Sequence, residues 1–185
     1  MFTNNGEERP TALDASDKAD FRKIYDQAMP LLFKVSLRIA GETEAAEDIV
    51  HDSFIKMNEK KMVFPSSNDA IFWLIRVVKN ASLNYARRKK REQIVYQRAL
   101  REDTRKVVSG ETEYLRKEAR QKTQAALKDL PENLRTVLVL REYGELKYKD
   151  IARILGITEG NVKIRVFRAR EQLAALIGED NVYLS

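Results

Sequence analysis

The 185-residue sequence contains no cysteine and only one histidine, His51. The lack of cysteine excludes disulfides and thiolate metal sites. Glu47 and His51 are spaced like two ligands on one helix face, but a zinc site needs further ligands, and the chain has no second histidine or cysteine to supply them. Composition alone leaves a carboxylate-rich magnesium site open, but we expect no metal and no other cofactor.

Long apolar runs and glycine-rich phosphate loops are also missing. No stretch of about 18 apolar residues is present to span a membrane, and the polar N-terminus lacks the apolar segment of a signal peptide. No serine or histidine arrangement indicates a nucleophile, and no phosphate loop is found, which argues against an enzyme. We expect a cytoplasmic protein that is not an enzyme.

Basic residues are in modest excess. Lysine and arginine total 34 against 28 aspartate and glutamate, giving a net charge of +6. This balance mildly favours a polyanionic partner. The hydrophobic fraction of 43% allows packed cores.

The segment 148–177 has the pattern of a helix-turn-helix. A short amphipathic stretch ends at Gly156, and Thr158 is an N-cap candidate for a longer helix. In that helix apolar residues recur at spacings of three and four, and the positions away from the apolar stripe are cationic: Lys163, Arg165, Arg168 and Arg170. A helix of this kind suits a major groove. The alternative is an ordinary helical hairpin whose basic face is solvated.

The N-terminal half predicts three helices. Residues 1–17 show no periodicity and are expected to be a mobile arm. Helical patterning follows up to Gly41, with a bend or restart at Pro30. A second helix with Thr43 as its N-cap candidate carries an acidic exposed face, which suits a protein partner better than DNA. After a loop at 62–69, a third helix begins near Ala70.

The third helix combines aromatic, amide and basic side chains and ends in the cluster 87–91. Single-stranded nucleic acid is bound by such residues, because bases stack on rings while cations follow phosphates. The basic cluster has a simpler alternative, a favourable helix C-terminus. Trp73 is expected to lie in the core. Residues 93–120 have few apolar positions and are expected to be a linker.

These patterns predict an all-α fold of two small helical domains joined by a flexible linker. The expected divisions are an arm at 1–17, a first domain at 18–92, the linker at 93–120, and a second domain at 121–185 that contains the helix-turn-helix.

The chain also resembles a known family. The segments AAEDIVHDSFIKM, FWLIRVVKNASLNYARRKKR and LPENLRTVLVLREYGELKYKDIARILGITEGNVKIRVFRARE are similar, in this order, to those of bacterial extracytoplasmic-function (ECF) RNA polymerase sigma factors. The resemblance implies an initiation factor that binds core RNA polymerase and directs it to promoter DNA. Its first domain (region 2) would contact the minus-ten element and its second (region 4) the minus-thirty-five element. An anti-sigma factor is a further expected partner.

The resemblance also implies roles for individual residues. Those expected to contact the clamp helices of the largest polymerase subunit are Glu47, Asp48, His51 and Asp52. Those expected at the minus-ten element are Phe64, Ser66, Ser67, Asn68, Asn80, Asn84, Tyr85, Arg87 and Arg88. Those expected at the minus-thirty-five element are Tyr148, Lys149, Asn161, Lys163, Ile164, Phe167 and Arg168.

The sequence departs from the common family pattern at two places. Ile164 and Phe167 are apolar where small polar or imidazole side chains are usual, so base preference cannot be transferred, although apolar groups can touch thymine methyls. The second helix ends in Met57-Asn58-Glu59, where an aromatic residue is often found.

Two other functions remain open from the sequence. A stand-alone helix-turn-helix regulator would leave the first domain and its acidic helix without a role. A protein-binding adaptor would need no DNA contact. Binding to polymerase with promoter-dependent transcription distinguishes the initiation factor from both.

Overall fold

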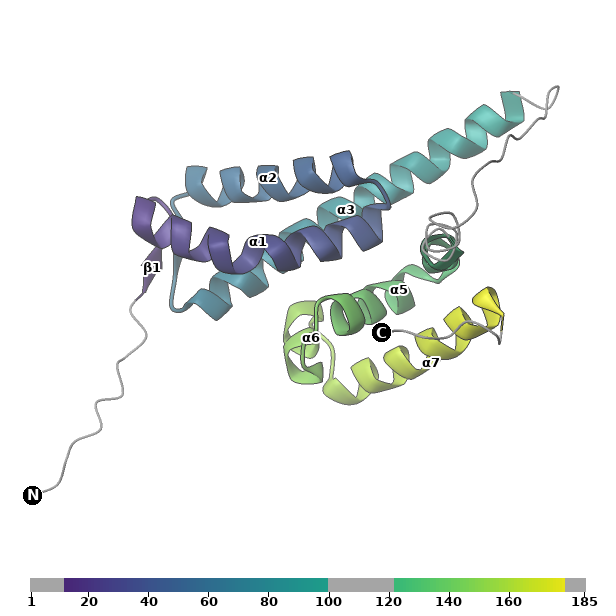
Figure 1. The fold of residues 1–185 in the computed structure, drawn as a ribbon. Coiled ribbons are helices and arrows are strands. Elements are labelled where there is room, and N and C mark those ends of the chain that lie inside the picture. Colours follow the sequence, from purple (N-terminus) through teal and green to yellow (C-terminus); the bar gives the residue numbers. More distant parts are fainter. Residues whose placement is uncertain (1–11, 100–121, 179–185) are drawn as a thin grey trace, which may run out of the picture.

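A computed structural model describes residues 12–99 and 122–178, which form two helical lobes (Figure 1). The first lobe contains β1 (Leu13–Asp14), α1 (Lys18–Ala40), α2 (Thr43–Glu59), β2 (Val63–Phe64) and α3 (Ser67–Ala99). The second lobe contains a helical stretch at 122–129, followed by α5 (Glu132–Leu138), the π-helical turn η1 (Val139–Tyr143), α6 (Tyr148–Leu155) and α7 (Glu159–Ile177). The predicted all-α class is confirmed.

The chain before α1 differs from the predicted mobile arm. Residues 1–11 lie outside the described part, but β1 pairs antiparallel with β2, with Leu13 opposite Phe64. Leu13 and Ala15 are buried, at 4% and 0% exposure. The arm prediction is therefore wrong for residues 13–17, and so is the prediction of a pure loop at 62–69. A pairing of two residues leaves too little periodicity for the sequence to indicate it.

Helix α1 begins after Asp17, whose carboxylate accepts hydrogen bonds from the backbone N–H groups of Ala19 and Asp20. This is the N-cap arrangement that satisfies orphan donors of the first turn. The helix then runs without a break through Pro30, so of the bend or restart predicted at that residue the restart is wrong, and the bend stays a prediction. The predicted end at Gly41 is confirmed, since this residue adopts a left-handed conformation after the last turn.

Helix α2 starts one residue earlier than expected. Glu42 occupies the N-cap position and Thr43 is already helical. The carboxylate of Glu42 makes no capping bond, because it accepts hydrogen bonds from Tyr85 and Lys89 of α3 instead. This contact fixes the start of α2 against the middle of α3.

The core of the first lobe lies where α1 packs against α2 and α3. Its fully buried side chains include Ile24, Leu32, Met57 and Leu74. Burying one such side chain contributes about 1.5–3 kcal/mol relative to leaving it in water. Other buried members of this core include Val35, Ile39, Val50, Phe54, Ile75 and Val78.

Helix α3 continues past the ends of α1 and α2 (Figure 1) and ends at Ala99, within the predicted linker range. Residues 100–121, which make up most of that predicted linker, lie outside the described part of the chain.

The two lobes are in contact. Helix α1 lies against η1, and α3 lies against α6. One cluster of buried apolar residues accordingly includes members of both lobes, among them Ile39 and Val78 from the first and Leu140 and Ile154 from the second. A separate cluster within the second lobe joins the stretch 122–130 to α5 and α7.

Candidate nucleic-acid interface

Helices α6 and α7 form the predicted helix-turn-helix. Helix α6 ends at Gly156, which has a φ of 67° and donates its N–H to the carbonyl of Ala152. The left-handed conformation costs glycine no steric strain, so the chain turns sharply there. The Thr158 side chain then accepts a hydrogen bond from the N–H of Asn161 at 3.2 Å, capping α7 as predicted.

In the turn between η1 and α6, position 144 has no room for a side chain larger than that of glycine. A Cβ built on this residue would lie 2.6 Å from the carbonyl oxygen of Leu140, which is part of the backbone and cannot yield. The left-handed position of the turn is taken by the next residue, Glu145, with a φ of 54°. Gly144 therefore lets the chain pass close to η1 before α6 begins.

Helix α7 buries one face and exposes the other. Val162, Val166, Ala169 and Leu173 are buried, as the apolar stripe predicts. The opposite face exposes the five residues expected in a major groove: Asn161, Lys163, Ile164, Phe167 and Arg168. Ile164 and Phe167 are 54% and 63% exposed, so two large apolar side chains lie one turn apart on this face. This face is accessible to duplex DNA.

Two cations of α7 are partly neutralised. The ammonium of Lys163 lies 3.2 Å from the carboxylate of Glu159, one turn earlier. Arg170 pairs with Glu142 of η1 at 2.5 Å, and this carboxylate raises the Arg170 pKa through their hydrogen bond. Both acids lie outside the cationic segment 163–170 in the sequence, and the fold brings them to it. Arg170 braces α7 against η1 rather than facing the groove.

Tyr148 and Lys149 lie at the start of α6. Lys149 is exposed, whereas Tyr148 is half-buried. The Tyr148 ring has the guanidinium of Arg141 4.8 Å from its centre and the ammonium of Lys163 at 6.0 Å. Cation–π contacts of this kind fix the ring at the edge of the α7 face.

The residues expected at the minus-ten element occupy different environments. Phe64 is only 5% exposed and packs against Trp73, with ring centres 6.0 Å apart. Its side chain is therefore not available to a base in this conformation. Asn68 is exposed, while Ser66 and Ser67 are half-buried. Strand pairing with residue 13 is what draws the phenylalanine inward.

Ser66 has a structural task at the start of α3. Its hydroxyl donates to the carboxylate of Asp69 at 2.7 Å and accepts from the Asp69 N–H at 3.3 Å. This reciprocal arrangement resembles a capping box. The hydrogen bond from Ser66 lowers the pKa of the Asp69 carboxyl, and a hydrogen bond from Arg153 lowers it by a smaller amount.

Further along α3, five predicted residues follow one another over two turns. Asn80 and Asn84 are exposed. Tyr85 is half-buried, and its bond to the Glu42 carboxylate raises the tyrosine pKa. Arg88 is exposed and contacts the Tyr85 ring at 5.5 Å. Arg87 binds the second lobe, because its guanidinium donates two hydrogen bonds to Glu132, at 2.7 and 2.5 Å.

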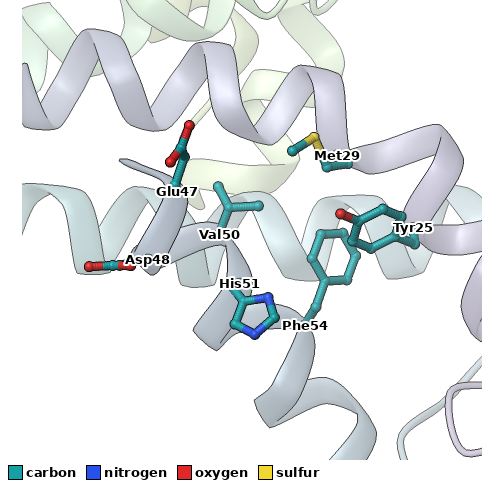
Figure 2. Close-up of a pocket in the computed structure, with 7 residues that line it drawn as sticks. All are labelled: Tyr25, Met29, Glu47, Asp48, Val50, His51 and Phe54. Atoms are coloured by element: carbon teal, nitrogen blue, oxygen red, sulfur yellow. The ribbon is translucent and has the colours of Figure 1, made fainter. Parts of the chain in front are cut away.

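The acidic face of α2 is present as predicted. Glu47, Asp48, His51 and Asp52 are all exposed. The first three line the rim of a shallow hollow of about 270 Å³ whose floor is apolar: Tyr25, Met29, Val50 and Phe54 (Figure 2). The Tyr25 and Phe54 rings lie together at one end, with centres 4.8 Å apart. The sequence did not indicate this aromatic floor, because periodicity does not show which apolar residues remain accessible at the surface.

No group of His, Asp and Glu side chains within 12–99 and 122–178 could hold a metal ion. In the same ranges no helix is long and apolar enough to cross a bilayer.

The two lobes match two family models. Residues 24–92 match Sigma-70 region 2, and residues 120–173 match Sigma-70, region 4. The chain is 35% identical over 134 residues to the ECF RNA polymerase sigma-E factor of Haemophilus influenzae, which covers 68% of this chain and 71% of the relative. The chain belongs to the ECF RNA polymerase sigma factor family. It is also 30% identical over 174 residues to the factor SigW of Bacillus subtilis, covering 85% of this chain and 88% of SigW.

A solved structure shares the fold of this sigma factor. It is the sigma factor RpoE from Bartonella quintana, in complex with the anti-sigma factor NepR. The TM-score is 0.61 with 22% sequence identity, over 88% of this chain and 99% of the other.

Contacts between the lobes of this sigma factor involve residues that sequence reasoning missed. Arg76 of α3 donates to the carbonyls of Arg153 and Ile154, at 2.6 and 3.1 Å. These carbonyls belong to the last turn of α6, where backbone acceptors have no partner within the helix. Arg153 in turn pairs with Asp69 at 2.6 Å and lies 5.2 Å from the centre of the Phe72 ring. The one signal of these contacts in the sequence was Arg76 itself, the single cation within the apolar run 70–78.

A second contact joins the end of α1 to the second lobe. The Arg38 guanidinium lies 4.3 Å from the centre of the Tyr143 ring. Gln124 donates to the Arg38 carbonyl at 3.1 Å and accepts from the Arg38 side chain at 3.4 Å. We call the arrangement held by these contacts, and by the Arg76 and Arg87 bonds, the closed form.

Proposed function

We propose that this protein binds core RNA polymerase and directs it to promoters by reading two DNA elements, one with each lobe. The observation that carries the proposal is the exposed α7 face on one lobe and the exposed α2 acidic face with its apolar hollow on the other. A DNA-binding protein has no use for an acidic surface toward DNA, so that surface suits a protein partner. Membership of the sigma factor family supports the same function.

The second lobe is proposed to bind the minus-thirty-five duplex. Helix α7 enters the major groove, with Lys163 and Arg168 near phosphates and base edges and Asn161 at the groove-facing start of the helix. The exposed Ile164 and Phe167 suit contact with thymine methyl groups, because each would otherwise keep apolar surface in water. Tyr148 and Lys149 meet backbone phosphates beside the groove.

The first lobe is proposed to bind the melted minus-ten strand. Asn68 and the neighbouring Ser66 and Ser67 line the loop, and Asn80 presents an amide on α3. Extruding a base costs a few kcal/mol of stacking and pairing, which hydrogen bonds from such groups offset. Phe64 supports the loop from the core side.

The remaining α3 residues are proposed to follow the strand toward the upstream duplex. They are Asn84, Tyr85, Arg87 and Arg88. Arg87 must exchange its bonds to Glu132 for phosphate contacts, which requires the lobes to separate.

The closed form holds the two lobes in contact, whereas reading both elements at once requires their DNA-reading faces to lie far apart. The two elements lie about 25 base pairs apart, as their names state, which is roughly 85 Å of duplex at 3.4 Å per base pair. Helix α3, the longest in the molecule's described part, has 33 residues and spans only about 50 Å. We propose that core polymerase stabilises an open form in which the lobes stand apart.

The α2 surface is proposed to bind the clamp helices of the largest polymerase subunit. Glu47, Asp48, His51 and Asp52 supply the charged rim, and the Tyr25–Phe54 floor accepts an apolar side chain. Such a rim with an apolar centre is the usual build of a protein interface.

An anti-sigma factor is proposed as a further partner, acting in the cytoplasm where core polymerase is found. The RpoE structure is a complex with such a factor, which supports this expectation for a chain of the same family. We propose no enzymatic activity.

The deciding experiment is core-dependent transcription. Purified protein is added to sigma-free core polymerase with genomic fragments as templates, and transcript starts are mapped. Defined starts that share upstream sequences support the proposal. The variant Asp48→Lys is expected to lose core binding, whereas Asp26→Lys, the same reversal on an exposed α1 position, serves as control. Absence of core binding by the unmodified protein refutes the proposal and favours a stand-alone DNA-binding regulator.

A further inference from the structure

A basic cavity of about 510 Å³ lies where the two lobes meet. The first lobe supplies the end of α1 and the later part of α3, and the second lobe supplies the segment from Lys128 to Glu132 together with Arg135. The volume is within the usual range for small-molecule sites, about 300–1,000 Å³. Because both lobes form its walls, the cavity exists only in the closed form.

The charge of the cavity wall is predominantly positive. Among the described residues that line it, the cations are Arg87, Lys89, Lys90, Lys128 and Arg135, and the only acids are Asp129 and Glu132. Two of the cations are already paired, Arg87 with Glu132 and Lys89 with Glu42. Within 12–99 and 122–178, no ion pair engages either Lys90 or Lys128. The wall thus keeps two ammonium groups without an ion pair in the described part of the chain, although the Glu42 carboxylate attracts that of Lys128 electrostatically.

Arg135 is the most unusual of these cations. It is only 7% exposed, and its Nε is buried without a hydrogen-bond partner among the described residues. Among the described residues its acceptor is the Lys128 carbonyl, at a long distance of 3.4 Å. Burial lowers the pKa of this guanidinium. Glu132 attracts this guanidinium, but the effect of burial is larger. Burying a charged group without satisfying its donors is costly, so the Nε of Arg135 favours an anion as its hydrogen-bond partner.

We propose that this cavity binds a small phosphorylated anion, of the pyrophosphate or nucleoside diphosphate class. Guanidinium and ammonium groups bind phosphate through charge-assisted hydrogen bonds, and arginine can do so with two parallel bonds. The cavity also has an apolar side formed by Ile39, Ala40, Leu130 and Pro131, against which an organic portion can pack.

The anion would stabilise the closed form, because it contacts both lobes and the open form has no such cavity. A ligand that binds one state alone shifts the equilibrium toward that state in proportion to its concentration over its Kd. The ligand site itself does not depend on the proposed function. The consequence of the site for transcription does depend on the proposed function, because a stabilised closed form competes with binding to polymerase.

The test is calorimetric titration of the full chain with inorganic pyrophosphate and with adenosine diphosphate, at constant ionic strength. The double variant Lys90→Gln with Lys128→Gln removes two cavity charges that make no ion pair. The control double variant Lys23→Gln with Lys60→Gln removes the same charge from exposed positions elsewhere. We expect the cavity variant to lose affinity by about tenfold or more and the control to match the parent.

Several outcomes overturn the proposal. Equal losses in both double variants would show general electrostatic attraction, and no binding of either anion at millimolar concentration would show that no site exists. Displacement of bound pyrophosphate by short duplex DNA and by adenosine diphosphate is compared at equal concentrations of phosphate groups. If the two displace it equally well, the cavity is part of a DNA path and not a small-ligand site. Tighter binding of adenosine diphosphate than of pyrophosphate supports an organic ligand, and equal binding supports a purely inorganic one.

The conformational consequence has a separate readout. Pyrophosphate is expected to shift the distance between labels on the two lobes toward that of the closed form, and an unchanged distance despite binding overturns this part. Failure of core-dependent transcription with anion binding intact would refute the proposed function and leave the site standing.

Discussion

Replacing Arg76 with methionine is expected to loosen the closed form. Its guanidinium donates to two carbonyls at the end of α6, at 2.6 and 3.1 Å, and also lies at the negative end of that helix. Hydrogen bonds from charged groups contribute about 1.5–3 kcal/mol each when they are buried. Arg76 is exposed, so we expect a total loss of about 1–2 kcal/mol for both bonds together.

A loss of this size changes the ratio of closed to open molecules by a factor of roughly 5–30. The lobes would not separate in every molecule, because the apolar contact of α1 with η1 and the Arg87–Glu132 pair remain. Methionine keeps the aliphatic length of the arginine stem, so the variant removes the charge and its bonds while retaining packing.

The change can be measured with spin labels, since the chain has no cysteine of its own. Labels at Gln27→Cys on α1 and Gln172→Cys on α7 occupy exposed positions, one on each lobe. Pulsed electron resonance then gives the distribution of distances. Arg22→Met is the control, because it removes an exposed guanidinium whose 3.7 Å pair with Asp26 lies entirely within α1.

The expected result is a larger population at long distances for Arg76→Met than for the parent or the Arg22 control. Half-maximal transcription should also need less of the Arg76 variant, because a binding-competent state that is more populated raises the apparent affinity. Identical distance distributions for the parent and Arg76→Met would refute the role assigned to these two hydrogen bonds.

Three further predictions concern the sites and pH. Arg168→Ala should weaken binding of the polymerase complex to the upstream element by about 1–3 kcal/mol, measured by competition, and equal loss on templates with a scrambled upstream element would contradict a base contact. Asn80→Ala should reduce permanganate reactivity of the melted strand without changing core affinity, with Asn133→Ala on the other lobe as control. The pKa of Glu42 is lowered, first by its lysine hydrogen bond and then by its tyrosine one. Its contribution to stability is thus complete above its ordinary pKa of about 4.3 and is lost as pH falls through the lower folded value. Thermal melts from pH 6 to pH 3 should therefore show a smaller acid destabilisation for Glu42→Gln than for the parent, while Glu44→Gln, an exposed carboxyl of the same turn, should follow the parent.

The helix-turn-helix could be predicted because its signals are local. Gly156, Thr158 and the apolar stripe of α7 each act within a few residues of their own position, so propensity and periodicity report on them directly. The exposure of the acidic α2 face follows from the same periodicity.

The contacts between lobes could not be predicted, because they join residues that are far apart in sequence. Arg76 binds backbone carbonyls 77 and 78 positions away, and a carbonyl acceptor leaves no mark in a sequence. The burial of Phe64 could not be predicted for a related reason, since a two-residue strand pairing decides that it faces inward. Arg170 looked free on its own helix, and only the fold brings Glu142 beside it.

The apolar cluster shared by the lobes also affects how well the unbound protein resists aggregation and proteolysis. Opening exposes Leu140 of η1 and the α1 residues packed against it, and exposed apolar surface promotes aggregation and attracts proteases. A free molecule is therefore safest when folded on itself, and an opened one is safest when polymerase covers it. The apolar surface that holds the lobes together in the closed form thus also sets how long unbound molecules persist. A variant that opens more readily should therefore be degraded sooner.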